Sequence, residues 1–252
     1  MSEALSTLEG WYVLHDFRSI HWSAWRTLPE ADRRDAVQEL KEWLLQCEAV
    51  NEGTDGGARG AFALYAIVGQ KADFLMLHMR ETLEELNDLE TQFNKLQFAD
   101  CALPAHAHVS VVELSNYTGK AGEEARNMPE IAARLYPKLP KSRHVCFYPM
   151  NKKREGADNW YMLAIEDRRR MMRSHGEIGR KYAGSVKQII SGSVGLDDWE
   201  WGVTLFSDDA LQFKKLVYEM RFDEVSARYG EFGPFFVGNL LTPQKLADML
   251  AI

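Results

Sequence analysis

Polar and hydrophobic residues alternate over short segments in the first half of the chain, and two longer segments carry hydrophobic residues at helical spacing. Alternation with aromatic or β-branched residues predicts a strand, and a period near 3.6 residues predicts a helix. Strands are predicted near residues 11–17 and at 60–68, 73–80 and 106–114, and helices near 31–50 and at 82–97. Gly69, Gln70 and Lys71 predict the turn between the second and third of these strands.

The second half of the chain repeats the order strand, helix, strand, strand, helix, strand. Its strands are predicted at residues 144–151, 185–193, 199–207 and 232–240, and its helices around His175 and up to about Arg221, the latter with Asp208 or Asp209 as N-cap. This repeat predicts an α+β fold of two ferredoxin-like halves that pack their sheets together. We expect an N-terminal half at residues 1–114, a connector at 115–143 rich in Gly, Pro and charged residues, and a C-terminal half at 144–252.

The composition, 46% hydrophobic and 27% charged, is that of an ordinary globular protein, and 252 residues suffice for one large domain or two small ones. No apolar run approaches the ~20 residues of a membrane span, and the N-terminus lacks the basic region and apolar core of a signal peptide. We therefore expect a cytoplasmic protein with no membrane span. Cys47, Cys101 and Cys146 are widely separated, which argues against a disulfide framework and a structural zinc site.

The net charge of −7 is unevenly distributed along the chain. Residues 138–187 contain thirteen Lys or Arg and five Asp or Glu, a local charge of about +8, whereas the remainder carries about −15. A basic segment inside an acidic protein indicates an anionic partner at that place rather than general nucleic-acid binding. Alternatively, these basic residues lie on a solvated helix face and the loop after it, and they bind no specific partner.

The segment around His175 is the most informative in the chain. On a helix, Met171, Met172, Ile178 and Gly179 lie three or four positions from His175 and share its face. A neutral imidazole on an apolar surface suits a haem iron, and the glycines that follow would let a flat macrocycle approach the helix. The alternative is a hydrogen-bonded core histidine, and the sequence offers no obvious carboxylate partner for the ring.

A second group of candidate residues lies on the strand that opens the second half. Strand periodicity places Tyr148, Met150 and Lys152 on one face, alternating with Pro149 and Asn151. Pro149 lacks an N–H and predicts an edge or terminating strand. Tyr148 could donate a proton or a single electron. Lys152 could neutralise a carboxylate or relay a proton. The alternative makes Tyr148 and Met150 core residues and Lys152 a surface charge.

Further candidates are polar residues scattered over the second half and the connector. Arginine and serine side chains bind carboxylates, and arginine forms bidentate charge-assisted hydrogen bonds. These candidates are Arg134, Gln188, Arg221 and Ser226. The sequence alone does not bring them together.

Several of these motifs occur together in one known family. They are Tyr-Pro-Met-Asn-Lys at 148–152, Met-Arg-Ser-His-Gly-Glu-Ile-Gly-Arg at 172–180, residues 199–201, Met-Arg-Phe-Asp-Glu-Val-Ser at 220–226, and residues 233–238. In this combination the chain closely resembles the coproheme decarboxylases, the branch of the chlorite-dismutase-like superfamily found in Gram-positive bacteria. The resemblance covers essentially the whole chain, including the doubled ferredoxin-like order, and implies a dimeric α+β barrel-type fold.

The resemblance also implies an activity and an assembly. The expected protein is a homopentamer whose C-terminal halves each bind iron coproporphyrin III (coproheme), the substrate and redox cofactor of its own conversion. Hydrogen peroxide would drive oxidative decarboxylation of two propionates to vinyl groups, giving haem b in the coproporphyrin-dependent route of haem biosynthesis. The tetra-anionic substrate would account for the basic segment, and a coproporphyrin ferrochelatase is a possible transient partner.

The same resemblance assigns roles to the candidate residues. His175 is implied to be the proximal iron ligand, Tyr148 the catalytic radical site, and Lys152 a donor or relay of a proton. The residues implied to surround the propionates and the distal face are Arg134, Tyr148, Pro149, Met150, Asn151, Lys152, Gln188, Arg221 and Ser226.

Three other functions compete on this fold. Chlorite dismutation is disfavoured because those relatives carry a distal arginine thirteen residues after the histidine, where this chain has Gln188. A dye-decolourising peroxidase role lacks an evident distal aspartate and arginine pair. A haem carrier, sensor or weak peroxidase is the main alternative, and Tyr148 separates it from a decarboxylase because a carrier does not require an oxidisable phenol beside the porphyrin.

Overall fold

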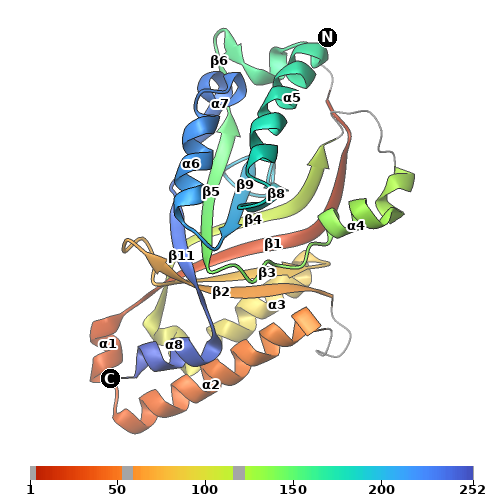
Figure 1. Cartoon of the computed structure of the whole chain (residues 1–252). Coiled ribbons are helices and arrows are strands. Elements are labelled where there is room, and N and C mark those ends of the chain that lie inside the picture. Colours follow the sequence, from red (N-terminus) through yellow and green to blue (C-terminus); the bar gives the residue numbers. More distant parts are fainter. Residues whose placement is uncertain (1–3, 53–58, 116–122, 252) are drawn as a thin grey trace. The chain divides into compact units, whose positions relative to one another are not determined.

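The computed structural model describes residues 4–52, 59–115 and 123–251. The chain forms two compact units, and each contains strands and helices (Figure 1). We name each unit by its longest helix. The α2 unit contains Trp11–Val109 and Phe236–Ile252, and the α5 unit contains Met1–Gly10 and Ser110–Phe235. The predicted α+β class is confirmed. In the described residues no helix is both long enough and apolar enough to cross a membrane.

The α2 unit is built on an antiparallel sheet with strand order β11-β2-β3-β1-β4. Its strands are β1 (Thr7–Ile20), β2 (Gly60–Val68), β3 (Phe74–Arg80), β4 (Ala102–Ser115) and β11 (Phe236–Leu241). Its helices are α1 (Trp22–Thr27), α2 (Glu30–Ala49), α3 (Leu83–Asn94) and α8 (Pro243–Leu250), with 3-10 turns at Val50–Glu52 and Gln97–Cys101. The predicted turn at Gly69 and Gln70 is present, with φ of 97° and 62°.

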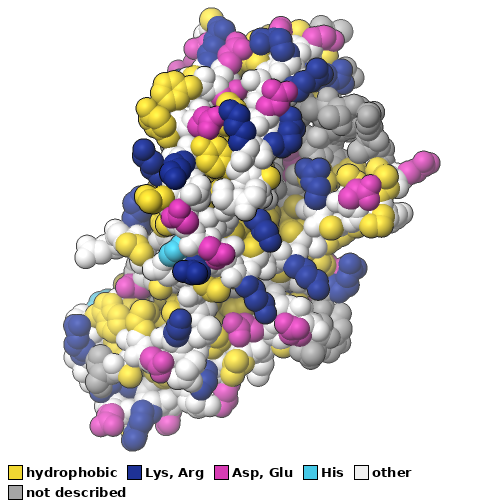
Figure 2. All heavy atoms as spheres, viewed as in Figure 1, with side chains coloured by type: hydrophobic (Ala, Val, Ile, Leu, Met, Phe, Trp, Pro, Cys, Tyr) yellow, Lys and Arg dark blue, Asp and Glu magenta, His cyan; other side chains and the backbone are white. Residues whose placement is uncertain are grey.

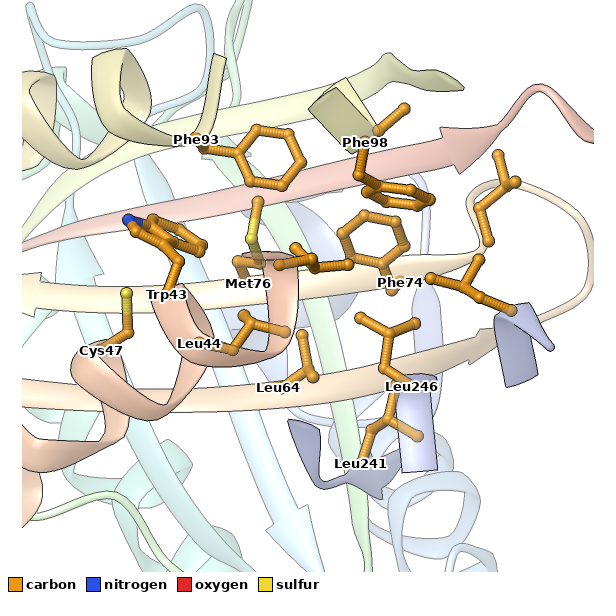
Figure 3. Close-up of a cluster of buried hydrophobic side chains, with 14 of the residues drawn as sticks. Trp43, Leu44, Cys47, Leu64, Phe74, Met76, Phe93, Phe98, Leu241 and Leu246 are labelled. Carbon is orange, nitrogen blue, oxygen red and sulfur yellow. The ribbon is translucent and has the colours of Figure 1, made fainter. Parts of the chain in front are cut away.

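Helices α2, α3 and α8 place apolar side chains against β2 and β3 (Figure 3). Trp43 and Leu44 come from α2 and Phe93 from α3, and the paired residues Leu64 and Met76 come from the sheet. All five are buried, and burying a large apolar side chain contributes about 1.5–3 kcal/mol. This apolar core belongs to the α2 unit and holds none of the candidate site residues.

His78 on β3 is buried in this core and is expected to make the fold sensitive to acid. Its ring lies 4.8 Å from that of Phe62 and 6.1 Å from that of Trp43, and burial, assisted by the charge of Arg80, lowers its pKa to about 3. The folded protein therefore keeps His78 neutral, whereas the unfolded chain binds a proton below pH 6.5. Stability falls as the pH drops below that value, by about 2 kcal/mol at pH 5 from this group alone.

Urea unfolding at pH 7 and pH 5 measures this effect. His78→Phe, which keeps an aromatic ring among Phe62 and Trp43 but has no titrating nitrogen, should show a smaller loss between the two pH values. Equal losses in the parent and the variant would contradict the assignment to His78.

The α5 unit is built on the strand order β4-β8-β9-β5-β10, with antiparallel pairing of β4 with β8, β8 with β9, β9 with β5 and β5 with β10. Its other strands are β5 (His144–Lys152), β8 (Lys187–Gly192), β9 (Trp201–Ser207) and β10 (Gly230–Phe232), with a small hairpin of β6 (Arg154–Glu155) and β7 (Asp158–Asn159). Its helices are α4 (Pro129–Leu135), α5 (Ile165–Lys181), α6 (Leu211–Met220) and α7 (Glu224–Tyr229), with 3-10 turns at Glu123–Asn127 and Trp160–Met162.

Some predicted boundaries differ from the observed ones. The strand predicted at 232–240 is divided into β10 and β11, which belong to different units, and the predicted connector contains α4. The expected connector residues 116–122 lie outside the described residues. The first ten residues group with the α5 unit and the last segment with the α2 unit, so the units do not follow the divisions at 114 and 144. The N-cap of α6 is Ala210, although Asp209 accepts a hydrogen bond from the Leu211 N–H at 3.0 Å.

Pro149 does not lie in an edge strand, which was one of the two alternatives predicted from the sequence. Strand β5 pairs with β9 on one side, where Pro149 faces Gly202, and with β10 on the other. The Pro149 carbonyl accepts the Gly233 N–H at 2.9 Å, and in a strand the N and C=O of one residue point to the same side. The missing N–H therefore faces the end of β10 rather than β9, so proline costs no hydrogen bond in the β5–β9 pairing.

Candidate functional site

Helix α5 carries His175 and has the charge pattern that stabilises a helix. Glu166 and Asp167 lie in its first turn and Arg180 and Lys181 in its last, which complements the helix dipole at both ends. Its inner face contributes Met171, which is buried in a small apolar cluster with Trp160, Val225 and Tyr229. This packing fixes α5 against α7 and leaves the His175 side chain 29% exposed.

Asp223, at the start of α7, is the hydrogen-bonding partner of His175. The His175 Nδ1 and Asp223 Oδ2 atoms are 2.8 Å apart, and the Asp223 side chain is 1% exposed. Asp223 is also the N-cap of α7 and accepts the Ser226 N–H at 3.3 Å. Burial alone would raise the pKa of Asp223, but the hydrogen bond and charge of His175 outweigh it, so the pKa lies below its usual value.

The carboxylate partner of His175 that was not obvious from the sequence is therefore Asp223. Asp223 lies 48 residues further along the chain, and no local pattern connects the two positions. The only signal in the sequence is that Asp223 precedes a short helical segment as a good N-cap. Because Nδ1 is engaged by Asp223, Nε2 is the nitrogen left to accept a proton or bind a metal.

Lys152, the last residue of β5, is buried close to the same carboxylate. Its Nζ lies 5.1 Å from the centre of the Trp160 ring, and its backbone N–H donates to Glu200 at 2.9 Å. Burial lowers the pKa of Lys152 to about 8, although the charges of Asp223 and Glu200 oppose this shift. Lys152 can therefore give up a proton near physiological pH.

Tyr148 lies on β5 within a group of aromatic rings. Its ring is stacked on that of Phe235 with centres 4.4 Å apart, and the Phe232 ring lies 5.9 Å away. Burial, with a smaller contribution from Cys146, raises the pKa of Tyr148, while the positive charge of Arg221 acts in the opposite direction. The phenol therefore stays neutral at physiological pH.

Arg221 stands at the C-cap of α6 and is exposed at the surface of the protein. Its guanidinium carbon is 3.7 Å from the centre of the Phe232 ring, a cation–π contact. The short loop from Arg221 to Asp223 thus joins the Tyr148 group to the His175 group.

The remaining candidates differ in their contacts. Gln188 lies against α5, because a Cβ on Gly179 would come within 3.5 Å of its Nε2. Asn151 accepts the Glu200 N–H at 2.8 Å, and Met150 pairs with Trp201 and Phe232 across the sheet. Arg134 is exposed in the last turn of α4, and within the described residues no hydrogen bond or ion pair joins it to the His175 or Tyr148 groups.

The sequence-predicted residues His175, Lys152, Tyr148, Arg221 and Ser226 therefore converge in the α5 unit. Asp223, Phe232 and Phe235 complete this group and were missed from the sequence. Figure 2 shows dark-blue, magenta and yellow side chains interspersed over the region of α5, α6 and α7. The site combines a carboxylate-supported imidazole, a buried amine, a buried phenol and an exposed guanidinium.

Comparison with known proteins assigns the family. The chlorite dismutase family model matches residues 25–241, so the chain belongs to the chlorite dismutase family. A solved structure described as a novel haem-binding protein from Thermus thermophilus is 48% identical, with 100% of this chain and 99% of that one covered at a TM-score of 0.93. A mutant chlorite dismutase from Candidatus Nitrospira defluvii is 18% identical, with 97% of each chain covered at a TM-score of 0.78, a likeness of fold alone.

Proposed function

We propose that this protein binds coproheme and uses hydrogen peroxide to convert two of its propionates to vinyl groups, giving haem b. The observation that carries the proposal is the placement of a buried phenol, Tyr148, in the same unit as the carboxylate-supported imidazole of His175. The family relationship and the haem-binding relative support an iron porphyrin as the ligand. The basic residues of the segment 138–187 suit its four carboxylates.

The residues of the site fit an iron porphyrin. His175 has one nitrogen held by a buried carboxylate and its side chain partly exposed, so its other nitrogen would be suited to bind the iron of a porphyrin. A Cβ on Gly176 would meet only the Arg180 Nη1 within 4 Å, at 3.6 Å, so the surface of α5 beside His175 can accept a flat group. When bound, the iron porphyrin would supply the oxidising power of its reaction with peroxide.

The overall reaction consumes a proton and removes a hydrogen atom from the propionate, and these two steps give the amine and the phenol separate roles. One propionate, one hydrogen peroxide and one proton give one vinyl group, one carbon dioxide and two waters. Tyr148, once oxidised by loss of an electron and its phenolic proton, would take a hydrogen atom from the β-carbon of the propionate. Its burial disfavours the phenolate, so Tyr148 exchanges hydrogen as a neutral group.

Lys152 would supply the proton that each turnover consumes, and this predicts a pH dependence. Because burial lowers the pKa of Lys152 to about 8, its charged form is lost as the pH rises through that value, and the rate should fall with it. The measurement is kcat between pH 6 and pH 10. Lys152→Met should lower kcat by roughly 10²–10⁴-fold and remove this limb of the profile. If kcat of Lys152→Met depended on pH as in the parent protein, Lys152 would not be the proton donor.

Asp223→Asn tests the support of the iron ligand without removing the helix cap. Asparagine caps a helix as well as aspartate, so α7 should remain folded, whereas the negative charge beside His175 is lost. We expect the iron–histidine bond to weaken, with a lower iron–imidazole stretching frequency and porphyrin affinity reduced by roughly 10–100-fold. Asp223→Ala is the matched variant that also removes the cap, and it should additionally lower thermal stability. An unchanged stretching frequency in Asp223→Asn would contradict the support role.

The decisive experiment is mass spectrometry of the porphyrin after the purified protein is mixed with iron coproporphyrin III and a few equivalents of hydrogen peroxide. Stepwise loss of two carboxyl groups, ending in haem b, would establish the decarboxylase. Tight binding without a mass change, or bleaching of the macrocycle, would favour the alternative of a haem carrier, sensor or weak peroxidase. The description of the 48% identical relative as a haem-binding protein is the observation that favours this alternative.

The remaining parts of the proposal concern the context of the reaction. We propose a cytoplasmic homopentamer that receives coproheme in transient contact with a coproporphyrin ferrochelatase. Arg134, Gln188, Arg221 and Ser226, with the segment Tyr148 to Lys152, would line the propionates and the distal face. Sedimentation velocity of the porphyrin-loaded protein tests the assembly.

A further inference from the structure

Phe232 joins the two groups of candidate residues that would act on a propionate. Its ring lies 5.9 Å from that of Tyr148, and the Arg221 guanidinium carbon lies 3.7 Å above its centre. Phe232 is therefore placed to fix the guanidinium of Arg221 relative to the phenol of Tyr148.

The backbone around Phe232 is built to hold its ring in this place. Residues of β10 pair with β5, with Phe232 opposite Met150 and Gly230 opposite Lys152. A Cβ on Gly230 would come within 2.8 Å of the Phe232 ring and of the Ser226 carbonyl, so only glycine lets the ring lie this close to the backbone. The ring thus has a fixed position with Tyr148 and Arg221 as its neighbours.

A guanidinium stacked on an aromatic face keeps its edge free for hydrogen bonding. The Arg221 guanidinium carbon lies 3.7 Å from the centre of the Phe232 ring, and within the described residues no hydrogen bond or ion pair engages the guanidinium, so its N–H groups can form a bidentate bond with a carboxylate. Arg221 also acts electrostatically on Tyr148. A carboxylate bound by Arg221 would therefore lie close to the phenol.

We propose that Phe232 is a positioning residue that holds Arg221 so that a propionate bound by the guanidinium is the one presented to Tyr148. This inference rests on the proposed function and identifies how the site would select a carboxylate for reaction. Phe232 would therefore influence the propionate through Arg221 and not by contacting the porphyrin itself.

A double-mutant cycle tests this dependence by titrating iron coproporphyrin III into the full-length protein without peroxide. Phe232→Leu keeps an apolar side chain but has no π face, and we expect it to weaken binding by about tenfold, within the range of cation–π contacts. Phe232→Tyr keeps the face and should bind as the parent does. In an Arg221→Met background, Phe232→Leu should have no further effect.

Phe235→Leu is the matched control, because Phe235 stacks on the Tyr148 ring whereas the guanidinium of Arg221 lies over Phe232. Its effect should add to that of Arg221→Met. Additive effects of Phe232→Leu and Arg221→Met, or failure of Phe232→Tyr to bind as the parent, would overturn the inference.

Turnover separates the inference from the proposed function. If the parent makes haem b and Phe232 and Arg221 are not coupled, only the positioning role fails. If the two are coupled in binding but the parent makes no haem b, the proposed function fails and the propionate-binding role of the pair stands. No binding of coproheme by the parent overturns both. In Phe232→Leu with saturating coproheme, kcat should also fall, because a misplaced propionate lies further from Tyr148.

Discussion

Tyr148→Phe is expected to bind coproheme with the affinity of the parent protein and to produce no haem b. The variant keeps the ring that stacks on Phe235 and lies close to Phe232, so the packing of β5 is unchanged. It loses the only atom of the side chain that can give up a proton and regain a hydrogen. The rate of vinyl formation should therefore fall by at least the roughly 10²–10⁴-fold typical of losing a group that transfers a proton.

The measurement is the yield of haem b by mass spectrometry together with a binding titration of the same variant. Tyr182→Phe serves as the control, because Tyr182 belongs to the same unit but donates its hydroxyl to Glu219 at 2.8 Å, away from the Tyr148 group. The Tyr182→Phe variant should give the same yield of haem b as the parent protein. Full turnover by Tyr148→Phe would remove the radical role from this residue.

His175→Ala should have the second large effect, on the iron rather than on the porphyrin carboxylates. Loss of the imidazole would remove the proposed iron ligand, and it leaves the buried carboxylate of Asp223 without the ring it now contacts at 2.8 Å. We expect the absorption and spin state of bound ferric coproheme to change, and affinity to fall by more than the roughly 10–100-fold expected for losing a supporting carboxylate. Binding of coproheme should persist, because Arg221 and the other residues proposed to bind its carboxylates are intact.

Added imidazole provides the control for this variant. If His175 is the ligand, free imidazole should fill the space left by the side chain and restore the parent spectrum at concentrations that leave the parent unchanged. A coproheme spectrum of His175→Ala identical to that of the parent would show that another residue binds the iron.

Local sequence patterns identified the elements that carry the site. The alternation of Tyr148, Met150 and Lys152 correctly predicted β5, and the apolar spacing around His175 correctly predicted α5. Tyr148 and Lys152 are both buried, so the alternative that made Lys152 a surface charge was wrong. These features depend on spacings of two to four residues, which a single sequence displays directly.

Features that depend on distant contacts could not be read in this way. Asp223 meets His175 only because α7 packs against α5, and Phe232 meets Arg221 only because β10 pairs with β5. The rule that proline marks a strand edge failed at Pro149 because the direction of its missing N–H depends on which neighbour each residue faces. The exchange of terminal segments between the two units likewise has no local signal.

If His175 binds the iron as proposed, the two contacts of Asp223 would link the colour of the bound porphyrin to the folding of a short helix. The carboxylate that contacts His175 also accepts the Ser226 N–H at the beginning of α7, and α7 is held at the surface by ion pairs between Arg170 and Glu224 and between Arg228 and Asp158. Exposed substitutions that fray α7 would reorient this carboxylate and alter the electron density on the imidazole. Under the proposed function, the redox properties of the iron would therefore respond to substitutions at solvent-facing positions, and natural variants would adjust the iron chemistry without altering any residue that touches the porphyrin.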